Sequence, residues 1–136
     1  TLLVNEKNIK ILAMKKVQNY FILDILSEVR FIYNNQDEIE EIGTSLYIEN
    51  INVNDLNLEL YSSHNIFILE NNDLEDRKNA FDSMIYLKYK EENLINDNMK
   101  NICITRLIYL LEENLDKVDS LKIEFEIDGA MKVFEM

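Results

Sequence analysis

The spacing of apolar side chains changes along this chain, and it limits the fold more than any other feature of the sequence. Between residues 8 and 34, apolar side chains recur at three- and four-residue intervals, which indicates one long amphipathic helix. Residues 20–26 are rich in β-branched and aromatic types, so a shorter helix followed by a strand is the alternative. Between residues 45 and 70 the interval changes to two, which is typical of strands with one buried face.

The alternating stretch predicts three strands. A two-residue turn at positions 54–55 would pair Val53 with Leu56 and keep the apolar side chains of both strands on one face, as a half-buried hairpin requires. Residues 62–65 contain turn-forming types and are expected to connect this hairpin to a third strand over 66–69.

Two further helices are predicted in the second half of the chain. Residues 72–75 resemble a capping box in which Asn72 replaces the usual Ser or Thr, and apolar side chains follow at helical spacing to about residue 92. Asn98 is a candidate cap for the next helix, because the apolar residues between 104 and 118 form the most regular helical stripe in the chain.

The last segment predicts a hairpin. Residues 121–127 alternate between apolar and charged types, and an Asp-Gly pair then signals a turn. A two-residue turn would place Lys132 opposite Phe125 on the core face, whereas a three-residue loop over 128–130 would place Val133 there. We therefore expect the three-residue loop.

Together these elements predict a single α+β domain over residues 1–136, with about three helices packed on an antiparallel sheet of about five strands in the order α-βββ-αα-ββ. The chain begins with Thr1, so we expect that it is processed or is a piece of a longer chain. Its first residues do not resemble a signal segment, no stretch is apolar enough for a membrane span, and the single Cys103 fits a reducing compartment. These features predict a cytoplasmic protein.

The chain is poor in side chains that carry chemistry, with one His, one Cys, two Gly and no Pro. Ser62, Ser63 and His64 are adjacent, but neighbouring residues rarely supply a nucleophile together with its base and oxyanion hole, so a polar turn is their expected role. Cys103 is expected to be a buried structural thiol. The acidic residues lack the spacing of a calcium loop, and no phosphate-binding loop motif is present. We expect no catalytic residue, no metal site and no cofactor.

The chain is strongly acidic, with 26 Asp and Glu against 14 Lys and Arg and a formal net charge of −12. The predicted partner-binding residues form two clusters, which are Asp37, Glu38, Glu40 and Glu41, and Glu112, Glu113, Asp116 and Asp119. Glu112 and Glu113 would lie late in a helix, where the helix dipole disfavours negative charge. Their charge is therefore expected to serve something other than the fold.

These observations predict a non-enzymatic interaction protein that docks on a basic protein partner through complementary charge. The expected role is that of a bacterial immunity protein or antitoxin that neutralises a nuclease-type toxin. The alternatives are a phage-type nucleic-acid mimic that inhibits a host nucleic-acid enzyme, a chaperone for a secreted effector, and a small hydrolase. Direct binding to nucleic acid is not expected because the chain has no basic stripe, membrane binding is not expected either, and the oligomeric state stays open.

Overall fold

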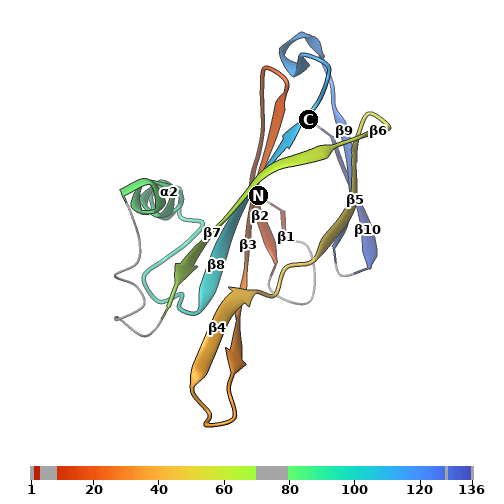
Figure 1. Ribbon diagram of the computed structural model, residues 1–136. Coiled ribbons are helices and arrows are strands. Elements are labelled where there is room, and N and C mark those ends of the chain that lie inside the picture. The colour runs from red at the N-terminus through yellow and green to blue at the C-terminus, as the bar shows by residue number, and fades with distance from the viewer. Residues whose placement is uncertain (1, 4–8, 70–79, 128, 136) are drawn as a thin grey trace.

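The chain folds mostly into β-strands, which form two sheets accompanied by one described α-helix (Figure 1). The computed structural model describes residues 2–3, 9–69, 80–127 and 129–135. The predicted arrangement of about three helices on one sheet of about five strands is therefore wrong.

The larger sheet is antiparallel, with the strand order β1-β2-β3-β8-β7 and with β4 paired to the far end of β3. Its strands are β1 (Leu2–Leu3), β2 (Lys10–Val17), β3 (Tyr20–Tyr33), β4 (Ile39–Thr44), β7 (Glu59–Ile68) and β8 (Ile102–Leu110). A two-residue turn joins β2 to β3, because Val17 pairs with Tyr20 and Gln18 takes a positive φ of 56°.

The smaller sheet is also antiparallel and has the strand order β10-β9-β5-β6. Its strands are β5 (Ile48–Val53), β6 (Leu56–Asn57), β9 (Lys122–Ile127) and β10 (Ala130–Glu135). The predicted turn at positions 54–55 is confirmed, since Val53 pairs with Leu56 and both turn residues have positive φ, as a type I′ turn requires.

The elements form three layers, with α2 (Ala80–Glu91) on one face of the larger sheet and the smaller sheet on the other (Figure 1). Successive side chains of β3 and β8 point to opposite faces, so these strands contribute to two cores. Phe21 and Leu107 belong to the core between the sheets, whereas Leu26 and Ile104 belong to the core beneath α2.

The long helices predicted over residues 8–34 and 98–118 are wrong, because β2 and β3 fill the first segment and β8 lies in the second. β8, and β3 as far as Ser27, are covered on both faces, so they lack the apolar-polar alternation of a half-buried strand. A continuous apolar run of this kind also matches the helical intervals. Asn98 begins no helix, and only one turn of 3₁₀ helix, η1 (Leu115–Lys117), follows β8.

Two predicted turns are also wrong. Residues 62–65 lie inside β7, which continues without a turn. The β9–β10 hairpin has the two-residue turn, and it sets Lys132 opposite Phe125. The inner face of β10 does not need Val133, because Phe134 packs there and its ring stacks on Phe125 at a centroid distance of 5.3 Å.

The helix predicted to end near residue 92 is confirmed in its described part by α2. The capping box proposed at residues 72–75 lies outside the described residues. Within the described ranges, no helix has the length and apolar character needed to cross a membrane.

Candidate functional site

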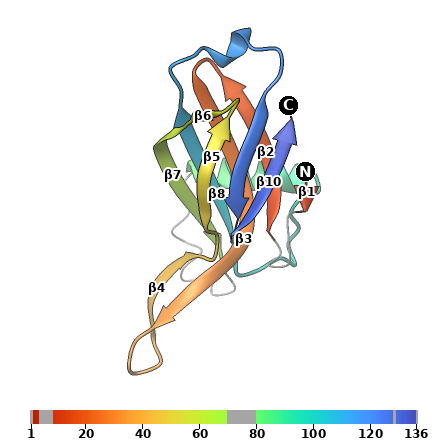
Figure 2. The same ribbon diagram turned by 90° about the vertical axis from the view of Figure 1, so that its right-hand side faces the viewer.

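The β3–β4 hairpin projects from the body of the molecule as a two-stranded arm (Figures 1 and 2). β3 pairs with β8 as far as Glu28, and from Val29 onwards it pairs with β4. We refer to residues 29–44 as the arm. It contains the whole of the first predicted acidic cluster.

The tip of the arm is an ordered turn. The side-chain oxygen of Asn34 accepts hydrogen bonds from the backbone N–H groups of Gln36 at 2.8 Å and Glu38 at 3.0 Å. The backbone N–H of Asn34 also donates to the carbonyl oxygen of Glu38 at 2.9 Å. The acidic side chains of the cluster, Asp37, Glu38, Glu40 and Glu41, are all exposed on this turn and on β4.

Large apolar side chains lie exposed beside these acids. Tyr33 is 57% exposed and Ile39 is 43% exposed, although the two residues pair across the arm. The ring of Tyr33 contacts that of Phe31 at a centroid distance of 6.4 Å. Neither Tyr33 nor Ile39 belongs to a core cluster, so burial within the fold does not account for them.

The second acidic cluster lies at the opposite end of the molecule, in the connection between β8 and β9 (Figure 2). β3 reaches from one cluster to the other, and its 14 residues at a rise of about 3.3 Å each place the clusters roughly 40 Å apart. Glu112 and Glu113 follow a strand rather than a helix, so the argument from an unfavourable helix dipole is wrong. The structure does not bring the two clusters together.

A buried ion pair lies beneath α2. Asp24 has no exposed area, and its carboxylate accepts hydrogen bonds from Nε and Nη2 of Arg106, each at 2.9 Å. The hydroxyl of Tyr89 on α2 donates to the same carboxylate. Hydrogen bonding to Asp24 raises the pKa of Arg106, and burial together with this carboxylate raises the pKa of Tyr89 well above its usual range.

His64 lies next to this pair on β7, directly opposite Arg106 on β8. Its Nε2 atom is 2.6 Å from Oδ1 of Asp82 on α2. The Phe81 ring lies 6.3 Å from the imidazole and 5.7 Å from the Arg106 guanidinium carbon. The sequence did not indicate the Asp82 partner, because the contact depends on α2 packing against β7.

A hollow of about 360 Å³ opens at this point, and we name it the His64 hollow. It is lined by Ser62, Ser63, His64, Phe81, Arg106 and Ile108. Within the described part of the chain, neither serine hydroxyl is hydrogen-bonded to His64, so the contact that would activate a serine nucleophile is not formed.

Cys103 lies on the other face of the larger sheet from His64, because it is three residues from Arg106 on the same strand and successive side chains alternate. Its thiol is buried and lies 3.6 Å from the hydroxyl oxygen of Thr105. Burial raises the pKa of the thiol. Cys103 and His64 therefore cannot share a catalytic pocket.

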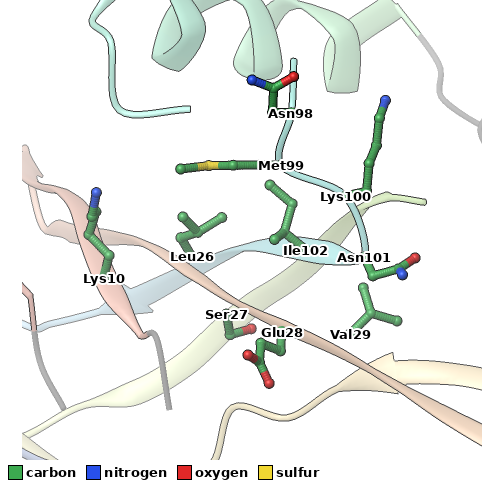
Figure 3. Close-up of a pocket in the computed structure, with 10 residues that line it drawn as sticks. All are labelled: Lys10, Leu26, Ser27, Glu28, Val29, Asn98, Met99, Lys100, Asn101 and Ile102. Atoms are coloured by element: carbon green, nitrogen blue, oxygen red, sulfur yellow. The ribbon is translucent and has the colours of Figure 1, made fainter. Parts of the chain in front are cut away.

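A second cavity, of about 570 Å³, lies between β3 and the segment that leads into β8 (Figure 3). Leu26, Met99 and Ile102 give it an apolar wall, and Lys10 and Glu28 contribute opposite charges. No group of three or more metal-binding side chains occurs in the described ranges.

Comparisons with protein-family models, with curated proteins and with solved structures give no significant match. The function must therefore be inferred from the arm, the His64 hollow and the second cavity themselves.

Proposed function

We propose that this chain is a non-enzymatic interaction protein that docks its arm onto a basic surface of a partner protein. One observation supports the proposal above all others: the projecting arm presents exposed Tyr33 and Ile39 beside four carboxylates. Protein interfaces commonly combine aromatic side chains at their centre with charged groups around them. Complementary charge would then speed association and select the partner.

The physics of an isolated ribbon also favours this function. A two-stranded hairpin is only marginally stable in water, and exposing large apolar side chains on it gains nothing for folding. Acidic side chains on an exposed edge strand can prevent self-association, which accounts for the charge but not for Tyr33 or Ile39. A partner that covers the arm accounts for both features.

The proposed partner is a protein that binds nucleic acid, with a nuclease-type toxin as the specific candidate. Such proteins concentrate Lys and Arg where phosphates bind, and the arm would cover that surface. Binding should therefore weaken at high salt. A polyanion such as heparin should also displace the partner.

Two variants with the same net charge test the proposal. The arm variant carries Asp37→Asn, Glu38→Gln, Glu40→Gln and Glu41→Gln. The matched control carries Glu112→Gln, Glu113→Gln, Asp116→Asn and Asp119→Asn at the opposite end. Each removes four negative charges from the net −12, which leaves −8.

Both variants and the wild type are immobilised and exposed to source lysate at low salt, and bound proteins are quantified by mass spectrometry. We expect a basic partner that the wild type and the control retain and the arm variant loses. Equal retention by all three proteins, or loss from the control alone, would contradict docking through the arm.

A further inference from the structure

The His64 hollow contains hydrogen-bonding groups that the fold leaves unused. Within the described residues, the hydroxyl of Ser62 has no side-chain partner and Arg106 bonds Asp24 through Nε and Nη2, whereas the side chain of Ser63 alternates to the other face of the sheet. The bond between His64 Nε2 and the Asp82 carboxylate holds the imidazole at the edge of the hollow. A guanidinium has only donors, so a ligand that completes its bonding must bring acceptor oxygens.

Three cationic side chains, Arg106, Lys15 and Lys88, lie on the face of the sheet that carries the hollow, although the chain as a whole is strongly negative. Lys15, Ile22, Ile108 and Ser62 form one cross-strand row, so the Lys15 side chain points to the same face of the sheet as the hollow. Two strand spacings separate Lys15 from Ile108, which is about 10 Å and within one screening length.

Lys88 of α2 adds a second ammonium on this face, 5.4 Å from the centre of the Tyr89 ring. The proximity of the Lys88 ammonium is the main cause that lowers the pKa of Lys15, and burial and Arg106 make smaller contributions. Of the acids on this face, Asp24 and Asp82 are already bonded to Arg106 and His64, and Glu59 lies opposite Leu110, one row further along the sheet. The cations therefore favour an incoming anion.

The remaining walls of the hollow are apolar. Phe81 is half exposed and Ile108 is partly buried, so a flat apolar group could cover both. The volume of about 360 Å³ lies at the lower end of the range of small-molecule pockets.

We propose that the His64 hollow binds the carboxylate or phosphate group of a small aromatic molecule, with the anion at Arg106 and Ser62 and the ring against Phe81. The attraction of the oxygens to the guanidinium is charge-assisted, which fixes the orientation of the ligand. This site does not depend on the arm.

Amide chemical shifts of the ¹⁵N-labelled protein test the proposal, with benzoate, phenyl phosphate and the uncharged benzamide as probes. We expect saturable shifts at Ser62, Ser63, His64 and Arg106 with at least one anion, and none with benzamide. The relative affinities of benzoate and phenyl phosphate identify the preferred anion. Equal shifts with benzamide, shifts located elsewhere, or shifts that do not saturate would refute anion binding at this site.

Charge variants provide a second, independent test. The double variant Lys15→Gln/Lys88→Gln should bind the anion several-fold more weakly, since it removes the surrounding field without touching the lining residues. The matched control Lys117→Gln/Lys132→Gln, on η1 and on the smaller sheet, should bind like the wild type. An equal loss in both variants would show that general charge, rather than this site, attracts the probes. The amide spectrum itself shows whether each variant is folded.

Discussion

Replacing Arg106 with Met should destabilise the fold more than any other change of a single charged side chain among the described residues. The substitution leaves the Asp24 carboxylate without exposed area and without two charge-assisted hydrogen bonds. Removing one partner of a buried ion pair lowers the free energy of unfolding by about 3–5 kcal/mol. The Tyr89 hydroxyl still donates to the carboxylate, so we expect the lower part of that range, about 3 kcal/mol.

Urea unfolding at neutral pH, followed by circular dichroism, measures this cost directly. A domain of this size has a total stability of about 5–15 kcal/mol, so the variant should stay folded in water. The matched control is Lys90→Met, which breaks the exposed pair between Lys90 and Asp97, whose ammonium nitrogen and carboxylate oxygen lie 2.6 Å apart. Solvent screens such an exposed pair, so the control should unfold at nearly the same urea concentration as the wild type.

The double variant Asp24→Asn/Arg106→Met separates the buried charge from the lost contacts. Asn has the shape of Asp without its charge, so the double variant should be more stable than Arg106→Met alone by at least about 1 kcal/mol. A cost of less than about 1 kcal/mol for Arg106→Met, or a double variant no more stable than the single one, would refute the reasoning.

Two further predictions concern single positions. Burial raises the pKa of Tyr109 to about 12, so the unfolded chain loses this proton first as pH rises, and stability should fall by about 2 kcal/mol between about pH 10 and 12. Tyr109→Phe should show a correspondingly smaller fall in urea titrations, and an equal fall would contradict the cause. Gly129 has a φ of +83°, so Gly129→Ala should cost about 1–2 kcal/mol. Gly43→Ala, whose Cβ would meet nothing within 4 Å, should cost little, and equal midpoints for the two variants would contradict the backbone argument.

Local signals in the sequence predicted the elements that depend on local chemistry. The turn at 54–55 uses two residues that tolerate positive φ, and the strand at 121–127 has one buried face, so its alternation is visible. α2 keeps helical spacing because only one of its faces is covered. This strand and α2 each have one buried and one exposed face, so the spacing of their apolar residues indicates their structure correctly.

The central strands could not be predicted in this way. β3 and β8 have α2 on one face and the smaller sheet on the other, so their apolar residues reflect two environments at once. The predicted length of the turn after β9 was wrong for a related reason. The ring stacking between Phe125 and Phe134 decides which side of β10 faces inwards.

The candidate sites depend on contacts between distant segments. The sequence identified both acidic clusters, but their separation follows from the length of β3, which was itself predicted as a helix. His64 was identified as a candidate and set aside as part of a turn. Its pairing with Asp82 and its place opposite Arg106 require a continuous β7 and a helix that packs across it.

Folding and docking should be separable in the arm, because the environment along β3 changes at Glu28. From Leu23 to Ser27 every side chain is buried, and beyond Glu28 the strand leaves the body. Replacing Tyr33 and Ile39 with Ser should therefore change the free energy of unfolding by less than about 0.5 kcal/mol. The same variant should lose the partner that the wild type retains, because the apolar contacts of an interface lie at its centre. A loss of about 2 kcal/mol or more, typical of truncating a core side chain, would show that these residues serve the fold and would remove the reason to assign them to a partner.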